Sequence, residues 1–265
     1  MDKNFIETFA PEDEQPLERW VKNGGYTKIF RKIACIGDSL SSGEFESLND
    51  DGTHSYHDMF EYSWGQYLAR TNGCEVYNFS RGGMTAKEYF NVFADEKDFW
   101  NPDYRAQAYI IALGVNDINC REANPFGSVE EDIDFSNWRN NNTETFVGSY
   151  AAILQRYREM QPRARFFLMT LAKDKNENWK EYKEQHRCFL YTLSEHIENC
   201  YVIDLLRYAP DYDEKFQENF YLLGHLNPMG YVFTAEMVSS YIDYIIRHHM
   251  QDFRDVSFIG TDLHD

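Results

Sequence analysis

The chain is predicted to adopt an α/β fold in which a parallel β-sheet carries helices on both faces. Two observations predict this class: short apolar runs bounded by turn residues alternate with segments of helical periodicity, and 43% of the 265 residues are hydrophobic, enough for a full core. Because no repeat or Pro/Gly/Ser-rich linker divides the sequence, we expect one domain over residues 1–265, with an N-terminal extension (1–27) and a C-terminal tail (251–265).

Five apolar runs are predicted to form the strands of the sheet. Strands of a parallel sheet are buried on both faces and therefore have nearly continuous apolar sequences. In chain order the predicted strands are Ile29 to Ile36, Glu75 to Phe79, Ala108 to Leu113, Arg165 to Leu171, and Tyr201 to Leu205.

Four segments with apolar residues at intervals of three and four are predicted to be core-facing helices. The last has the clearest start, because Asn227 can cap the first free amides and Pro228 suits the first helical position. In chain order the predicted helices are Trp64 to Arg70, Phe146 to Met160, Trp179 to Ile197, and Pro228 to Met250.

Two long segments, Ser41 to Ser63 and Asn119 to Thr145, follow strand ends at the edge where open parallel sheets bind ligands. We expect them to wall a site and select its substrate, with a solvated loop of no role as the alternative. The second contains Phe126, Phe135 and Trp138, and is interpreted as a lid or rim.

Charge excludes several classes of partner. The formal net charge of -18, from 44 acidic and 26 basic residues, repels phosphate backbones and anionic membrane surfaces. No apolar run approaches membrane-spanning length, and the acidic amino terminus lacks the apolar core of a signal peptide, so a cytoplasmic location is expected. Five widely spaced cysteines indicate reduced thiols.

Four short motifs occur in a fixed order near the predicted strand ends and the start of the last helix. A serine in the first can act as a nucleophile if a neighbouring base takes its proton, and Ser39 is the candidate. The motifs are Gly37-Asp38-Ser39-Leu40, Asn78 to Thr85 with its Gly82-Gly83 pair, Gly114-Val115-Asn116-Asp117, and Gly224-His225-Leu226-Asn227-Pro228.

An ester carbonyl under attack needs hydrogen-bond donors aimed at its oxygen. The candidates are the backbone amides of Ser39 and Gly83 and the side-chain amide of Asn116. Glycine leaves its N–H open to the carbonyl, and asparagine is a neutral donor. In isolation, a turn glycine and a capping asparagine would be the preferred interpretations. Asp38 and Asp117 are interpreted as organisers of their loops.

His225 is the predicted general base, because an imidazole can accept the serine proton and return it to the leaving group. Its place in Gly-His-x-Asn-Pro, after the fifth strand and before a capped helix, favours it over the alternatives, which are His54, His57, His186, His196 and His264.

On these motifs, the chain over roughly residues 28–250 resembles the GDSL, or SGNH, hydrolase superfamily of esterases and acylhydrolases. The resemblance implies a three-layer α/β/α sandwich with a flavodoxin-like sheet. It also implies a nucleophile at Ser39, oxyanion donors at Gly83 and Asn116, and a catalytic histidine at His225.

One position departs from the family pattern. The last motif usually reads Asp-x-x-His, with the aspartate orienting the ring, but here the residue three before His225 is Leu222. We therefore expect another group to hold the ring. The backbone carbonyl of Leu222 is favoured, and the other candidates are the carboxylates of Asp204, Asp211, Asp213 and Glu218.

The sequence thus predicts a serine-dependent carboxylic-ester hydrolase that works through an acyl-enzyme without metal or other cofactor. Polar, aromatic-containing insertions favour short acyl groups, such as acetyl esters of carbohydrates. The alternatives are a lipid acylhydrolase or thioesterase, and a noncatalytic carbohydrate-binding or interaction protein on the same fold. The cluster of His54, His57 and Asp58 is interpreted as ordinary loop residues, not a metal site. The tail segment Phe253 to Phe258 could pack on its own domain or reach another subunit, so oligomeric state stays open.

Overall fold

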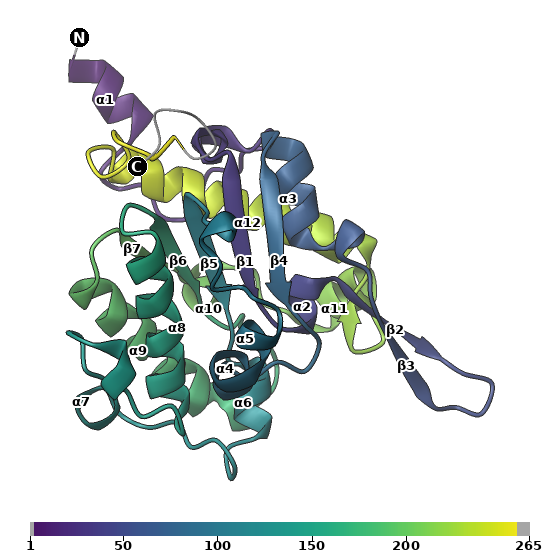
Figure 1. Ribbon diagram of the computed structural model, residues 1–265. Coiled ribbons are helices and arrows are strands. Elements are labelled where there is room, and N and C mark those ends of the chain that lie inside the picture. Colours follow the sequence, from purple (N-terminus) through teal and green to yellow (C-terminus); the bar gives the residue numbers. More distant parts are fainter. Residues whose placement is uncertain (1–2, 259–265) are drawn as a thin grey trace.

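A computed structural model describes residues 3–258 and confirms the α/β class (Figure 1). Five parallel strands form the central sheet in the order β4-β1-β5-β6-β7. Because β1 lies between β4 and β5, the chain reverses its direction of winding after the first two strands, and the loops that follow β1 and β5 flank the crevice where such sheets bind ligands. The strands are β1 (Lys32–Gly37), β4 (Glu75–Ser80), β5 (Ala108–Ala112), β6 (Arg165–Met169) and β7 (Cys200–Ile203).

Helices cover both faces of the sheet (Figure 1). α3 (Trp64–Asn72) and α12 (Pro228–His248) pack on one face, while α8 (Phe146–Met160) and α9 (Lys180–His196) pack on the other. Alternate residues of β1 serve the two cores: Ile33 faces α3 and α12, and Ala34 faces α8. Within residues 3–258, no helix is both long enough and apolar enough to cross a membrane.

Shorter elements fill the connections. The remaining helices are α1 (Lys3–Phe9), α2 (Ser39–Ser42), α4 (Ala86–Glu88), α5 (Ala94–Glu96), α6 (Val115–Asn119), α7 (Val129–Asp132), α10 (Leu205–Tyr208) and α11 (Glu214–Phe220). The minor strands are β2 (Glu44–Leu48) with β3 (His54–Asp58), and β8 (Tyr221–Leu222) with β9 (His225–Leu226).

All five predicted strands and all four predicted helices are present, and only their ends differ. The first strand begins three residues later than predicted, because Gly25–Ile29 forms a 3-10 turn. The last strand ends before Asp204, whose side chain accepts a hydrogen bond from the amide of Arg207 (3.1 Å) and caps α10.

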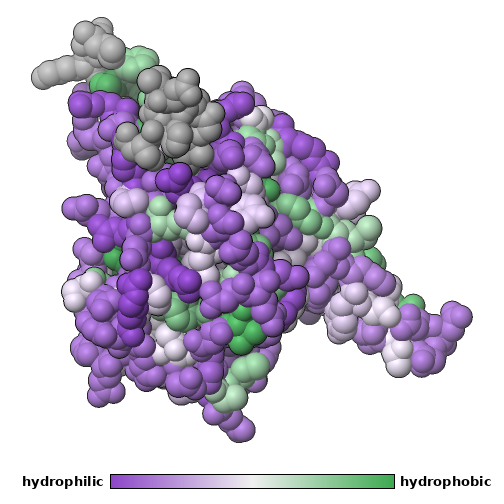
Figure 2. Space-filling view, in the orientation of Figure 1, coloured by the Kyte–Doolittle hydropathy of each residue, from purple (hydrophilic) through white to green (hydrophobic). Residues whose placement is uncertain are grey.

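The first insertion forms a β-hairpin that extends from the body of the molecule (Figure 1). Strands β2 and β3 are antiparallel, with Glu46 opposite Tyr56. The turn between them contains Gly52 with a φ of 81°, a conformation that favours glycine. Figure 2 shows that the exposed surface of this arm, like most of the molecule, is mainly hydrophilic.

The second insertion packs into the helical layer beside α8 and α9. Phe126 contacts the ring of Phe146 (5.3 Å between centroids), and Phe135 stacks on His196 (4.4 Å). Trp138 meets Phe90 edge-to-face at 5.7 Å. These three rings therefore pack on the helical layer of that face, and the role of the segment as a lid or rim stays a prediction.

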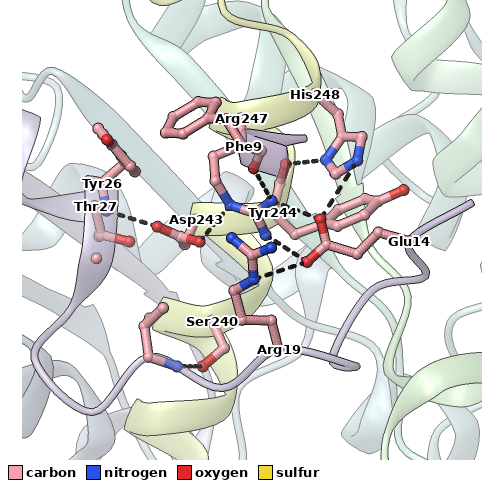
Figure 3. Close-up of polar contacts among 12 residues, drawn as sticks. Phe9, Glu14, Arg19, Tyr26, Thr27, Ser240, Asp243, Tyr244, Arg247 and His248 are labelled. Atoms are coloured by element: carbon pink, nitrogen blue, oxygen red, sulfur yellow. Dashed lines mark hydrogen bonds and ion pairs between the residues drawn. The ribbon is translucent and has the colours of Figure 1, made fainter. Parts of the chain in front are cut away.

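The N-terminal extension is fixed to the far end of α12 by a buried group of charges (Figure 3). Arg247 is 2% exposed and donates to both carboxylate oxygens of Glu14, at 2.5 and 2.8 Å. It also donates to Asp243 (2.8 Å) and to the carbonyl of Phe9 (2.8 Å). This group, with Arg19 and His248 at its edge, is called the Arg247 cluster below.

The C-terminal tail, as far as residue 258, packs on its own domain. Phe253 is buried against Phe30 and Phe167. The guanidinium of Arg165 donates to the carbonyl of Asp255 (3.1 Å). The sequence left open whether this tail packs on its own domain or reaches another subunit, and in the structure it packs on its own domain.

Candidate active site

Ser39 lies at the turn that follows β1. Asp38 caps α2 by accepting a hydrogen bond from the amide of Leu40 (3.1 Å), which makes Ser39 the first residue of that helix. Burial raises the pKa of Asp38 to about 7, and the nearby Asp117 and Glu44 raise it further against the effect of the Leu40 amide. Asp38 therefore organises the loop, as predicted, and the side chain of Ser39 is largely buried.

Gly83 and Asn116 lie side by side. The side-chain amide of Asn116, in α6 after β5, donates to the carbonyl of Met84 at 3.2 Å. Gly83 has a φ of 73°, and the space where a side chain would stand is empty. Within residues 3–258, the backbone amides of Ser39 and Gly83 have no hydrogen-bond acceptor. Both are therefore free to donate to a bound oxygen atom.

Asp117 ties the second and third motifs together. Its buried carboxyl accepts hydrogen bonds from the amide of Ala86 (3.1 Å) and the side chain of Asn124 (2.6 Å). Burial raises its pKa to about 7 despite these donors. Asp117 is thus a loop organiser, again as predicted.

His225 lies between two glutamates of the β2–β3 hairpin. Its Nδ1 atom is 3.2 Å from Oε2 of Glu46, and its Nε2 atom is 3.1 Å from Oε1 of Glu44. The ring of Tyr56 meets the imidazole edge-to-face, with 5.8 Å between centroids. The first insertion therefore does wall the site, and it does so with carboxylates.

No group that the sequence offered to orient His225 does so through its side chain. Asp204 is bound by Arg187 (2.6 Å), Asp211 by Lys173 (2.7 Å), and Asp213 caps α11 through the amide of Phe216 (2.8 Å). Glu218 has no contact with His225 among the described residues. The favoured carbonyl of Leu222 is also wrong, because Nδ1 faces Glu46.

A signal for Glu46 was present in the sequence. Residues 44–48 and 54–58 flank the turn-forming run Asn-Asp-Asp-Gly, which predicts a hairpin. In a strand, residues two apart face the same side, so Glu44 and Glu46 share a face. The hairpin pattern does not reveal that Glu46 contacts His225, because His225 is 179 residues further along the chain.

The two glutamates differ in electrostatic character. Burial opposes ionisation of Glu46, but the hydrogen bonds of His225, His54 and the Gly224 amide outweigh it and lower the pKa of this carboxyl. For Glu44, burial raises the pKa, His225 lowers it, and Asp58 and Glu46 raise it again, with a net upward shift.

Glu44 also connects His225 to the other motifs. A side chain at Gly82 would overlap the Glu44 carboxylate, so this carboxylate lies between Gly82 and the imidazole. The amide of Arg81 donates to the carbonyl of Gly37 (3.4 Å), which brings the second motif against the first. The four motifs therefore meet at one edge of the sheet.

Ser39 and His225 are not hydrogen-bonded to each other within the described residues, because Nε2 of the histidine faces Glu44. The other histidines within residues 3–258 lie elsewhere or have other roles. His186 is wholly buried against the carbonyl of Leu113 (3.1 Å), His196 stacks on Phe135, and His54 contacts Glu46. His264 lies outside the described residues.

A mainly apolar cavity of about 130 Å³ lies beside the Ser39 turn. The hydroxyl of Ser41 and the indole N–H of Trp64 are buried at its wall and have no hydrogen-bond partner within residues 3–258. Other residues that line it include Asp38, Leu40, Met169, Ala172, Leu205 and Leu226.

Among residues 3–258, no group of three or more His, Cys, Asp or Glu side chains is arranged to hold a metal ion. The five cysteines are free thiols. Cys35 is wholly buried, and burial raises its pKa, which keeps the thiol protonated and unreactive.

Comparison with known proteins identifies the family. The GDSL-like lipase/acylhydrolase family matches residues 35–233, and the chain belongs to this family. No curated protein sequence matches the chain.

Solved structures of carbohydrate esterases share the fold. A family two carbohydrate esterase from Clostridium thermocellum, in complex with cellohexaose, aligns with a TM-score of 0.58 and 16% identity over 90% of this chain and 66% of that one. A family 2 enzyme with a carbohydrate-binding domain from Corynascus thermopiles (Myceliophthora fergusii) gives 0.54 and 16%, over 86% and 68%. The acetyl xylan esterase AlAXEase gives 0.51 and 18%, over 80% and 99%. At these identities the likeness concerns the fold.

Proposed function

We propose that the protein is a carboxylic-ester hydrolase that uses Ser39 as its nucleophile and His225 as its general base. The ester carbonyl binds over Ser39, and its oxygen accepts hydrogen bonds from the amides of Ser39 and Gly83 and from the Asn116 side chain. Each such donor contributes about 3 to 4 kcal/mol to stabilising the transition state.

The proton follows one route through both halves of the reaction. As the Ser39 oxygen bonds to the carbonyl carbon, its proton passes to Nε2 of His225. The imidazolium then gives this proton to the leaving alkoxide as the ester C–O bond breaks, which forms the acyl-enzyme. Water repeats these steps, releases the acid and restores the serine.

One observation carries this proposal: two backbone amides without an acceptor and one asparagine side chain lie at the same edge as His225. The Asn116 amide touches Met84, directly after Gly83, and Glu44 spans from Gly82 to His225. In a chain of the acylhydrolase family, this arrangement favours ester hydrolysis over binding alone.

Short acyl esters of carbohydrates are the proposed substrates. The proteins of similar fold include carbohydrate esterases and an acetyl xylan esterase. The formal net charge of -18 disfavours anionic lipid surfaces.

The test compares wild type with Ser39→Ala on a short activated ester and with a fluorophosphonate probe. Wild type should hydrolyse the ester and become covalently labelled, and the variant should do neither while keeping its melting temperature. Turnover retained by Ser39→Ala would reject the mechanism. A wild-type serine that resists the probe would favour a noncatalytic binding protein.

The cavity beside the Ser39 turn supports a second candidate, an acylhydrolase for longer chains. Its apolar wall suits an acyl chain better than a sugar. A series of esters with increasing acyl length separates the two. If the cavity binds the chain, Ala172→Phe should lower kcat/KM for long esters and spare acetyl esters; equal effects on all lengths would exclude it.

A further inference from the structure

The strongest unassigned feature of the site is the carboxylate of Glu46, which comes from a hairpin and not from the motif that carries His225. Its Oε2 atom lies 3.2 Å from Nδ1 of His225 and accepts the amide of Gly224 at 2.7 Å. Its Oε1 atom is bound by Nδ1 of His54. Both carboxylate oxygens are thus used.

We infer that Glu46 is the positioning residue that holds His225 in its reactive tautomer and orientation, in place of the aspartate that usually precedes the histidine. The inference rests on the proposed function. In the neutral imidazole, a carboxylate that accepts from Nδ1–H selects the tautomer in which Nε2 has no proton, and this is the form that can take the proton of Ser39 once Nε2 has left Glu44.

The local geometry explains why position 222 can be leucine. The Leu222 side chain is 49% exposed and projects into solvent at the β8–β9 turn, while Glu46 is 6% exposed and faces the imidazole. A side chain on Gly224 would lie 2.7 Å from the Glu46 carboxylate, so the glycine in Gly-His-x-Asn-Pro leaves room for this contact. The hairpin and the last motif are therefore fitted to each other.

Glu46 is rigidly held, which is what a positioning residue requires. Donors from two other segments, His54 on β3 and Gly224 before β9, fix both carboxylate oxygens. Glu44 differs, because within the described residues the only side chain that pairs with its carboxylate is His225, through Nε2. Since Nε2 must face Ser39 during the reaction, Glu44 has to leave this nitrogen, whereas Glu46 can keep Nδ1 throughout.

The experiment compares Glu46→Gln and Glu46→Leu with wild type. Glutamine keeps the shape and an oxygen that can accept from Nδ1–H, whereas leucine removes the acceptor. We expect kcat to fall at least about 100-fold for leucine, within the range for loss of a positioned acid-base group, and by a smaller factor for glutamine. KM should stay within about twofold of wild type in both variants. Asp50→Asn, which removes a charge at the exposed hairpin turn, is the matched control and should match wild type.

A second measurement does not depend on activity. In wild type, the Nδ1 proton of His225 should give a downfield NMR resonance that Glu46→Leu abolishes. Glu44→Gln should retain this resonance, because Glu44 faces the other nitrogen. If wild type lacks esterase activity but the resonance depends on Glu46, the proposed function fails and the contact stands.

Two results would overturn the inference. One is a folded Glu46→Leu variant whose kcat stays within about threefold of wild type. The other is a Nδ1 resonance that survives Glu46→Leu or disappears in Glu44→Gln. Should Glu46→Leu fail to fold, Glu46→Ala removes the same acceptor with a smaller side chain, and an unchanged kcat together with an unchanged Nδ1 resonance in that variant would exclude the positioning role.

Discussion

Two basic side chains near opposite ends of α12 are each enclosed by two carboxylates, with different results. At the far end, Arg247 lies between Glu14 and Asp243 (Figure 3). Just before the helix begins, His225 lies between Glu44 and Glu46. Arginine keeps its charge at every physiological pH, whereas an imidazole can release its proton.

The two basic side chains also differ in how fully they are hydrogen-bonded and buried. The guanidinium of Arg247 donates to two carboxylates and a backbone carbonyl, and its side chain is 2% exposed. The His225 side chain is 16% exposed, and Nε2 faces a carboxylate whose burial raises its pKa. A satisfied, permanent charge stabilises the fold, while a less enclosed, titratable pair is suited to chemistry.

The largest expected effect separates activity from stability. His225→Asn should lower kcat for ester hydrolysis by at least about a thousand-fold, because the proton of Ser39 loses its acceptor. The free energy of unfolding should fall by less than in Arg247→Met, because Glu46 keeps the Gly224 amide and His54 as partners and the asparagine amide can donate to it. Kinetics with an activated ester, alongside urea unfolding, measure both quantities. A large loss of stability with activity retained would show that His225 belongs with the Arg247 cluster as a structural residue.

Arg247→Met should have the opposite profile. It removes the ion-pair partner shared by two buried carboxylates, leaving Glu14 with Arg19 and His248 at its edge and Asp243 with the amide of Tyr26, and should cost about 3 kcal/mol in the free energy of unfolding. kcat/KM per folded molecule should not change. Arg19→Met is the matched control, because Arg19 is 43% exposed in its contact with Glu14 and should cost less than about 1 kcal/mol. Equal losses from both variants would contradict the distinction.

The fold and the candidate site residues could be predicted from the sequence. Apolar periodicity predicted the five strands, because burial on both faces leaves a local trace in each run. The turn glycine and the residues after strand ends predicted Ser39, Gly83 and Asn116. Their neighbourhood follows from the topology of the sheet, since parallel strands end at the same edge.

The carboxylates that pair with His225 and Arg247 could not be predicted from the sequence, for one physical reason. Glu46 and His225 are 179 residues apart, and Glu14 and Arg247 are 233 apart, so no local pattern joins them. Each carboxylate comes from a decoration of the fold, the β2–β3 hairpin or the N-terminal extension. How these segments dock depends on tertiary packing, which periodicity does not encode.

A rise in pH should have opposite effects on the stability that the two regions contribute. Asp117, near the proposed site, has a pKa raised by burial from 3.8 to about 7, so the folded protein binds its proton more tightly than the unfolded chain. Its contribution to stability is fully present below about pH 4 and is lost as pH rises toward 7. For Glu14, burial is outweighed by Arg247, Arg19 and His248, which lower the pKa, so its contribution is lost as pH falls.

Asp117→Asn tests the sign. Relative to wild type, this variant should gain stability between pH 5 and pH 8, by a few kcal/mol at most, because asparagine can accept the same two hydrogen bonds without ionising. Glu14→Gln should lose stability relative to wild type over the range where Glu14 is ionised. Urea unfolding at both pH values measures the differences. If the free energy of unfolding of Asp117→Asn differs from that of wild type by the same amount at every pH, the two regions do not have opposite pH dependences.

The smallest expected effect concerns two leucines with left-handed backbone conformations, one beside each region. Leu223, two residues before His225, has a φ of 57°, and Leu17, in the N-terminal extension, has a φ of 66°. A left-handed conformation costs a non-glycine residue about 1 to 2 kcal/mol. Leu223 is 45% exposed and Leu17 is 9% exposed, so glycine relieves the backbone at both positions but removes buried apolar surface only at Leu17.

Leu223→Gly should therefore raise the free energy of unfolding by up to about 1 kcal/mol, after the entropy that glycine adds to the unfolded chain is subtracted. Leu17→Gly should lower it. Thermal unfolding of the two variants beside wild type measures the difference in sign. If Leu223→Gly is destabilising, the left-handed turn before His225 is held by contacts of the leucine side chain, and the turn is not a source of backbone strain at the proposed site.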